Sequence, residues 1–417
     1  MNPVPPWTTQ FALPCEQENP QVFDTIVNTH GVAMVGALLR LHGAAIARAS
    51  PGLRDFLASW AAEPGPSDTP WDIAFGRLQL AVAQWQATSQ GEAVRFDPVD
   101  VAAKVGLRIA ESGHRGAWQM PFSPEAVRVG GWLVPRADRA EVENLPSAPA
   151  RIRVHADGVW HSLQRDAADG VWRVTGTGRN ETSAVGVERL RTVGAQGGVL
   201  LLPSRALPPA ERSGDIFKEC QPVDVVDDAA AQSFADGFAL LARNTPQYLP
   251  WIERVLHGIV VCPRQVEYRL VSGSFEDAPG LVHMSSPHSG VDIAEVLVHE
   301  CAHQYFYMLQ RVGPVDDASD ATLYWSPPIR KRRPLSRILM AYHALANVQL
   351  LFDAVRANPS NDAQVVGYVR INEPELQAAI EALDEPLRGN SALTPLGRGL
   401  YEPLAQRMAQ RLQAAPA

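Results

Sequence analysis

The sequence predicts an α+β fold in three successive regions, and three patterns support this. Apolar residues recur at helical spacing in residues 1–120, short β-like runs fill residues 121–205, and helices alternate with strands over residues 206–417. With 417 residues, of which 46% are hydrophobic, the chain is long and apolar enough to bury a large core. We therefore expect a helical N-terminal region, a β-rich middle region and a C-terminal region that mixes both.

In the N-terminal region the helical pattern is clearest at Val22–Val27 and at Ile73–Trp85. The middle region changes to short β-branched and aromatic runs. The tetrapeptide Asp-Gly-Val-Trp occurs twice there and places a turn dipeptide before each strand start. We expect a β-meander with strands at Val127–Val134, Ile152–Val154, Val159–Leu163, Val171–Val174 and Val199–Leu202.

A boundary is expected near residue 205, because Leu202–Glu211 is rich in proline and small residues. In the C-terminal region an arginine-rich loop, Pro327–Pro334, separates two long apolar helices. The patterns predict helices at Ala229–Arg243, Val291–Leu309 and Leu335–Val355, and strands at Ile259–Cys262, Glu267–Val271 and Leu281–Ser285.

The composition argues against several partners and compartments. A net charge of −8 is unsuited to holding a phosphate backbone, so nucleic acid is not an expected partner. The apolar run Gly31–Leu39 is far shorter than the ~20 residues that span a bilayer, and no basic residue precedes Arg40, as a secretory signal would require. The four cysteines lie far apart without a C-x-x-C pair. We expect reduced thiols and a cytoplasmic protein with no membrane partner.

The long helix near Val291 carries the sequence His299-Glu300-Cys301-Ala302-His303. Two histidines four residues apart lie on one face of a helix, about one turn apart, so both imidazoles can reach one metal ion with Glu300 beside it. The alternative is two incidental helix histidines. The longer form of the motif, H-E-x-x-H-x-x-G-x-x-H, is absent because Phe306 and Leu309 occupy its glycine and third histidine positions.

A metal held by two imidazoles normally needs a third protein ligand. His343 is the single histidine on the next long helix, and we predict it as that ligand, although a lone histidine on an apolar helix is commonly a hydrogen-bonded core residue. A carboxylate ligand would have to come from Glu373, from Glu375 or from upstream. His283 and His288 are nearer in sequence, but we interpret them as surface or supporting residues.

The loop between the two helices carries Arg330-Lys331-Arg332-Arg333 between prolines. Such a run is often a solvated surface. Alternatively, Arg330 or Arg333 presents its planar guanidinium to a carboxylate of a bound small molecule.

Residues 205–405 resemble the H-E-x-x-H proteins of ribosomal peptide pathways, which are regarded as 2-oxoglutarate-dependent peptide β-hydroxylases. The resemblance rests on the His299–His303 motif, on Ser272-Gly273-Ser274 and Pro279-Gly280 before it, and on Tyr324-Trp325-Ser326-Pro327, Arg333-Pro334-Leu335 and Leu393–Gly397 after it. It implies a zincin-like C-terminal domain in which His299, His303 and, less firmly, His343 bind Fe(II). Position 340, where a histidine would also lie one turn from the loop, is Met340.

The resemblance further implies that Tyr324 and Ser326 help Arg330 or Arg333 to bind 2-oxoglutarate. The partner would be a precursor peptide, hydroxylated at a side-chain β-carbon. In that chemistry Glu300 orients a ligand or substrate. In a zinc metallopeptidase, the runner-up, Glu300 would deprotonate a metal-bound water. A third hypothesis is a binding protein with a degenerate metal site.

Overall fold

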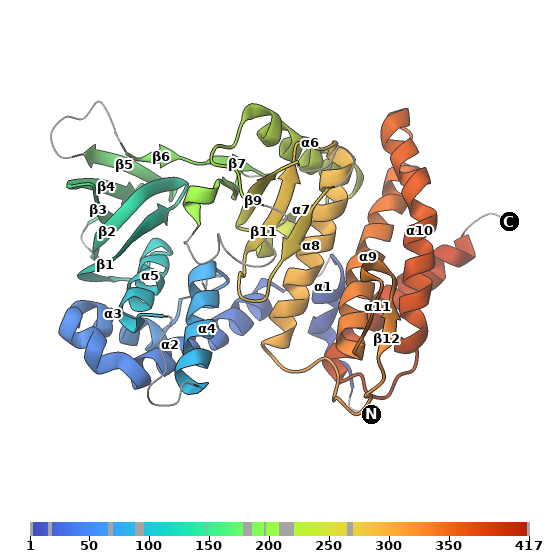
Figure 1. Cartoon of the computed structure of the whole chain (residues 1–417), viewed down its shortest axis with the longest axis horizontal. Coiled ribbons are helices and arrows are strands. Elements are labelled where there is room, and N and C mark those ends of the chain that lie inside the picture. The colour runs from blue at the N-terminus through green and yellow to red at the C-terminus, as the bar shows by residue number, and fades with distance from the viewer. Residues whose placement is uncertain are drawn as a thin grey trace.

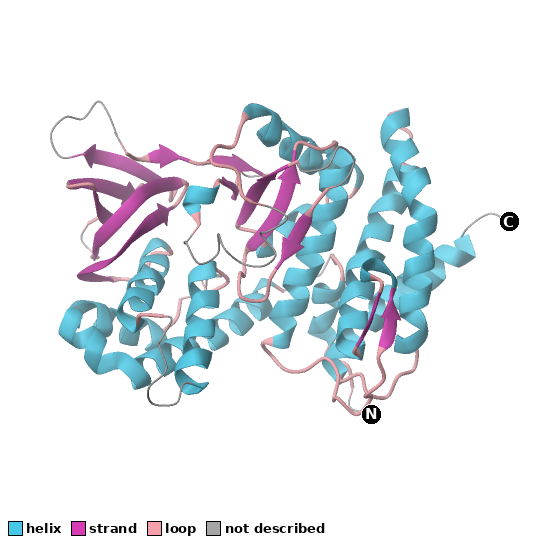
Figure 2. Cartoon of the chain, viewed as in Figure 1, coloured by secondary structure: helices cyan, strands magenta, loops and turns pink. Residues whose placement is uncertain are grey.

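The computed structural model describes residues 3–15, 19–65, 70–87, 96–146, 148–177, 186–195, 197–207, 221–264 and 270–414. It mixes helices and sheets, in agreement with the predicted α+β class (Figure 2). The helices α2 (Pro20–Ala49) to α5 (Pro98–Glu111) and an antiparallel sheet occupy one side of the molecule, and a second sheet with α1 (Thr9–Ala12) and the C-terminal helices occupies the other (Figure 1).

The N-terminal part is helical, as predicted. Its elements are η1 (Pro6–Thr8), α1 (Thr9–Ala12), α2 (Pro20–Ala49), α3 (Pro51–Ala62), α4 (Ile73–Ala87) and α5 (Pro98–Glu111). The side chains of Asn19, Ser50 and Asp97 cap α2, α3 and α5 by accepting hydrogen bonds from backbone N–H groups, and a proline follows each of these caps.

The first sheet is an antiparallel meander, as predicted, in the order β1-β2-β3-β4-β5, with β6 paired to β2. The predicted strand Val199–Leu202 is not part of it, because this strand joins the second sheet. Its strands are β1 (Gly116–Val129), β2 (Trp132–Asn144), β3 (Arg151–Ala156), β4 (Val159–Arg165), β5 (Trp172–Thr177) and β6 (Glu188–Arg189). Asp157 and Gly158, both with positive φ, form the two-residue turn between β3 and β4. The prediction of one strand at Val127–Val134 is wrong, because Gly130 adopts a φ of 56° and turns the chain from β1 into β2.

The second sheet has the order β10-β11-β9-β8-β7, and β9 runs parallel to both of its neighbours. Its strands are β7 (Arg191–Val193), β8 (Val199–Leu202), β9 (Gly258–Pro263), β10 (Ser272–Ser274) and β11 (Leu281–Ser286). Because β7 and β8 belong to the second sheet, the chain passes from the first sheet to the second between β6 and β7. This point lies earlier in the chain than the expected boundary near residue 205. Residues 267–269 of the predicted strand Glu267–Val271 lie outside the described residues.

The predicted long helices of the C-terminal part are confirmed as α6, α8 and α9. The elements after β8 that lie outside the second sheet are η2 (Ser204–Ala206), α6 (Asp228–Asn244), α7 (Tyr248–Val255), α8 (Gly290–Gln310), β12 (Tyr324–Ser326), η4 (Pro327–Ile329), β13 (Lys331–Arg333), α9 (Leu335–Ala357), α10 (Ala363–Leu387) and α11 (Pro395–Ala414). The strands β12 and β13 pair as a small hairpin that leads directly into α9.

The N-terminal helices do not share one core. Phe11 of α1 and Phe23 and Val27 of α2 pack into the core of the C-terminal part. Further along α2, Val35 and Leu38 pack into the core beneath the first sheet. The helix α2 therefore bridges two cores, and α1 belongs with the C-terminal helices.

Two described helices, α2 and α9, are long and apolar enough to cross a membrane by length and composition alone. Of the most apolar window of α9, 78% is buried inside the structure, as in a core helix, whereas the corresponding window of α2 is 33% buried. The expectation that the protein has no membrane partner stays a prediction.

The cysteines differ from the expectation in one respect. Cys15 and Cys301 are free, but Cys262 is disulfide-bonded, so the prediction of reduced thiols is wrong at this position. Sequence spacing does not reveal which thiols a fold brings within bonding distance. Cys220 lies outside the described residues.

Candidate metal centre

The helix α8 places the candidate motif at the centre of the C-terminal part. It starts at a capping box in which the Ser289 side chain accepts from the Asp292 backbone N–H and the Asp292 side chain accepts from the Ser289 backbone N–H. Gly237 lets α6 approach closely, because a Cβ at this position would lie 2.4 Å from a methyl group of Ile293. With α6, α7, α9 and β10 packed around it, α8 presents its histidines from a fixed position.

His299 and His303 lie side by side, as their spacing predicts. Their ring centroids are 4.7 Å apart and their planes are almost perpendicular, at 82°. Burial lowers the pKa of His303 well below its ordinary value, and the neighbouring imidazoles and the guanidinium groups of Arg337 and Arg333 lower it further. His303 is therefore neutral at physiological pH, the form in which histidine binds metals, and its buried Nδ1 has no hydrogen-bond partner.

Glu300 is held by two serines. Its side chain is 4% exposed. Ser272 Oγ donates to Glu300 Oε1 at 2.7 Å, and Ser274 Oγ donates to Oε2 at 2.8 Å. Alternate residues of a strand face the same side, so the Ser-Gly-Ser sequence of β10 directs both hydroxyls toward α8. Both carboxylate oxygens already accept a hydrogen bond, and the carboxylate is fixed beside the two imidazoles.

His343 occupies the fully buried face of α9 and touches the N-terminal segment. Its Nε2 donates to the carbonyl oxygen of Ala12 at 2.9 Å, and Asn347 Nδ2 donates to the same oxygen at 2.9 Å. Burial lowers the pKa of His343 to about 4, although the backbone carbonyls of Ala12, Phe11 and Ala302 act in the opposite direction. With its proton on Nε2, His343 carries a lone pair on Nδ1, which has no hydrogen-bond partner.

The fit of these residues to a metal is partial. Metal-binding histidines commonly donate their second ring nitrogen to a backbone carbonyl, which is the bond that His343 makes to Ala12. However, the described ranges contain no group of three His, Cys, Asp or Glu side chains close enough to hold an ion together. The pair His299 and His303 is assembled, and His343 as the third ligand stays a prediction.

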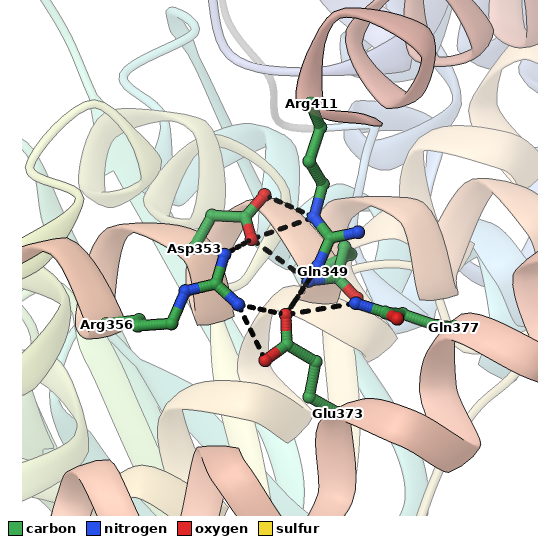
Figure 3. A network of polar contacts seen from close by, with 6 residues as sticks. All are labelled: Gln349, Asp353, Arg356, Glu373, Gln377 and Arg411. Atoms are coloured by element: carbon green, nitrogen blue, oxygen red, sulfur yellow. Dashed lines mark hydrogen bonds and ion pairs between the residues drawn. The ribbon is translucent and has the colours of Figure 1, made fainter. Parts of the chain in front are cut away.

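The carboxylates that the sequence offered as alternative ligands are engaged elsewhere or exposed. Glu373 accepts hydrogen bonds from Arg356 and Arg411 and from the amide of Gln349 (Figure 3). Burial alone would raise the pKa of Glu373, but the Gln349 hydrogen bond and the two guanidinium charges outweigh it and lower the pKa. Glu375 is exposed. The structure thus assigns Glu373 to an ion-pair network.

Of the two arginines proposed from the sequence, only Arg333 acts electrostatically on the histidines. Arg330 is exposed on the loop after η4, with a φ of 50°. The charges of Arg333 and of Arg337 both lower the pKa of His303. Arg337 also forms a hydrogen bond with the Tyr307 hydroxyl, which donates to the Ser274 carbonyl at 3.4 Å.

The sequence analysis missed Arg337. The available signal was its position, because Arg337 lies in the first turn of the long helix that follows the arginine-rich loop.

Tyr324 and Ser326 each contact other residues of the protein. The Tyr324 hydroxyl donates to Asp320 Oδ2 at 2.6 Å, and Asn390 Nδ2 donates to the same oxygen at 2.9 Å. Ser326 is 1% exposed and pairs with Lys331 across the hairpin. Their predicted part in cosubstrate binding stays a prediction. His283 is buried in β11, and His288 contacts Ser285, as supporting residues would.

Comparison of the sequence with protein-family models and with curated proteins gave no match.

Proposed function

We propose that this chain is an Fe(II)- and 2-oxoglutarate-dependent peptide hydroxylase that acts on a side-chain β-carbon of a ribosomally made precursor peptide. The observation that carries the proposal is the pair of adjacent imidazoles, His299 and His303, with the guanidinium charges of Arg333 and Arg337 acting on His303. A site with histidine ligands and two nearby cations suits an anionic cosubstrate such as a dicarboxylate.

Each of these side chains has a separate task in the proposed reaction. His299 and His303 hold the metal, and His343 completes the set through its unpaired Nδ1. Iron, when bound, supplies the redox chemistry with O₂ that protein side chains lack. Arg337, fixed by Tyr307, and Arg333 bind the far carboxylate of 2-oxoglutarate. Fe(II) is the proposed metal, and Zn²⁺ is the alternative.

The proposed binding place for the substrate peptide is an edge of the second sheet, beside the histidines. Within the part of the chain that the structure describes, β10 is the terminal strand of its sheet and pairs only with β11. An extended peptide can add to such an edge by backbone hydrogen bonds. Because Ser272 and Ser274 of β10 also hold Glu300, a peptide on this edge lies next to the candidate centre.

The zinc metallopeptidase alternative uses the same motif but requires Glu300 to act as a general base. A general base must reach the metal-bound water with a free oxygen. Each oxygen of Glu300 accepts one serine hydroxyl and keeps a second acceptor site, so the two hydrogen bonds fix the carboxylate in place and are compatible with either role.

The deciding experiment is a product mass measurement. The iron-loaded protein is incubated with 2-oxoglutarate, ascorbate, O₂ and a precursor peptide encoded beside it. A gain of about 16 Da with formation of succinate is expected, since one oxygen atom is inserted at a metal of this class. Shortened peptides formed with zinc and without 2-oxoglutarate would establish the peptidase instead. An unmodified peptide in both reactions, from protein that binds neither metal, would favour a binding protein.

A further inference from the structure

A cavity of about 420 Å³ lies between α9, α10 and α11, and none of its lining residues comes from α8. Its size is within the range of sites that bind small organic molecules. The cavity opens to solvent beside Glu381 and Arg388, which are exposed, and it reaches inward to Gln349, which is 0% exposed.

The walls of the cavity are largely apolar. The rings of Tyr342 and Tyr401 lie with their centroids 5.3 Å apart, and Ile380, Ala405 and Met408 complete the lining around them. Such a surface gains free energy by covering an apolar ligand and excluding water.

The charged side chains that line the interior are already paired within the protein. Asp384 accepts from Arg388 and, at 2.7 Å, from the Tyr401 hydroxyl. Arg411 donates to both oxygens of Asp353 at 2.9 Å and also to Glu373. These pairs leave no net charge to attract an ion, so the cavity favours a neutral occupant.

Gln349 supplies the polar feature at the inner end. Its Nε2 donates to Asp353 Oδ1 at 3.1 Å and to Glu373 Oε1 at 3.0 Å, which fixes the orientation of the amide (Figure 3). Its Oε1 is consequently directed away from both carboxylates, and it is buried without a hydrogen-bond donor. A buried acceptor without a donor is unfavourable, and native structures contain few of them.

We propose that this cavity binds a neutral, largely apolar small molecule that donates one N–H or O–H hydrogen bond to Gln349 Oε1. The ligand covers the tyrosine rings and supplies the hydrogen-bond donor that Gln349 Oε1 lacks. The site is separate from the candidate metal centre, so this inference does not depend on the proposed function.

The experiment compares two probes with the same ring system by isothermal titration calorimetry with the full chain. The first, 2-naphthol, has a hydroxyl that donates, whereas 2-methoxynaphthalene has the same rings and no donor. We expect 2-naphthol to bind about tenfold more tightly, because only this probe satisfies the buried acceptor. Equal affinities, as would result if an ordered water already satisfied Gln349, or no binding of either probe, would overturn the proposal.

Two pairs of variants locate the binding. Ala405→Trp fills the cavity from α11 and should abolish binding of both probes, while Gln406→Trp, at the exposed neighbouring position, should leave it unchanged. Persistent binding in Ala405→Trp would place the probes elsewhere and overturn the proposal.

Gln349→Met removes the acceptor and should bring the affinity ratio of the two probes to about one. Its control, Gln377→Met, loses a hydrogen bond to the same Glu373 but keeps the acceptor, so it should retain the ratio. A ratio retained in folded Gln349→Met would contradict the assignment. If Gln349→Met does not fold, two other measurements test the proposal. These are the affinity ratio of the two probes in the unmodified protein and the loss of binding in Ala405→Trp.

Discussion

The helix α9 contributes to two polar clusters, one partly exposed and one buried, that are constructed differently. Toward α10 and α11, Asp353 and Glu373 are paired with Arg356 and Arg411 by several hydrogen bonds each (Figure 3). Toward α8 and α1, His343 lies near His303, and each of these imidazoles leaves a buried Nδ1 without a partner.

This difference distinguishes polar groups that stabilise the fold from polar groups that can bind a ligand. The four charged groups of Asp353, Glu373, Arg356 and Arg411 are paired with one another and stabilise the fold without a ligand, although the neighbouring Gln349 Oε1 has no donor. Buried imidazole nitrogens without partners retain capacity to bind something else, and two adjacent histidines make a metal the fitting occupant. The four predictions below test this contrast.

The largest effect is expected on metal affinity. Loss of one imidazole in His303→Ala should weaken binding of Co²⁺ or Zn²⁺ by about 100-fold, because it removes half of the assembled ligand pair. Calorimetric titration of the full chain measures this affinity. His288→Ala is the matched control, since His288 contacts Ser285 and lies off α8. An unchanged affinity in His303→Ala would remove the histidine pair from the site.

The next effect concerns stability. Glu373→Ala should lower the free energy of unfolding by about 2 kcal/mol, because it leaves the mostly buried Arg411 and the half-exposed Arg356 without a carboxylate that both now contact. Urea denaturation measures the change. Metal affinity per folded molecule should stay as in the unmodified protein, and a parallel loss of metal binding would show that the two clusters are not independent.

The two clusters should also respond to pH in different windows. Because the folded state holds the pKa of His343 at about 4, below its ordinary 6.5, the unfolded chain binds more protons between these values. Stability therefore falls as the pH drops from 6.5 to 4, by at most about 1.4 kcal/mol per pH unit for this group.

His343→Asn, which keeps a donor toward Ala12, should reduce that slope in urea titrations at successive pH values. Burial also lowers the pKa values of His30 and His283, so part of the slope persists. The pKa of Glu373 is lowered from its ordinary 4.5, so Glu373→Gln should change the pH dependence only below about that value. Identical slopes in His343→Asn and the parent protein would contradict the assignment.

The smallest effect is expected at the arginines. Arg337→Lys should weaken 2-oxoglutarate binding to the metal-loaded protein by about tenfold, because an ammonium group cannot form the paired contacts of a guanidinium. Arg330→Lys, in the exposed loop, is the control and should have no effect. Metal content of both variants should be unchanged. Equal dependence on 2-oxoglutarate in Arg337→Lys, Arg333→Lys and the parent protein would exclude these arginines.

Local sequence patterns predicted much of the fold because the relevant forces are local. Helical spacing located α8 and α9, and the Asp157-Gly158 turn located a hairpin. The pattern failed at Val127–Val134, where a run of apolar residues concealed the turn at Gly130. Apolar content alone does not separate one strand from two strands joined by glycines.

The candidate site was predictable only where its residues share one helix. His299 and His303 are neighbours by spacing, whereas the serines that hold Glu300 come from a strand 26 and 28 residues away. The contact of Ala12 with His343 spans 331 residues, and no periodicity encodes such a pairing. Tertiary packing also decided that Arg337 acts on His303.

The hydrogen bond from His343 to Ala12 also bears on how the protein matures. Ala12 leaves the ribosome 331 residues before its hydrogen-bond partner. At about 5–20 residues per second, the N-terminal segment waits roughly 15 to 65 seconds for the helix that receives it. During this interval Phe11 and its neighbours are exposed apolar surface. The segment around Phe11 therefore stays without its packing partner until α9 has been synthesised.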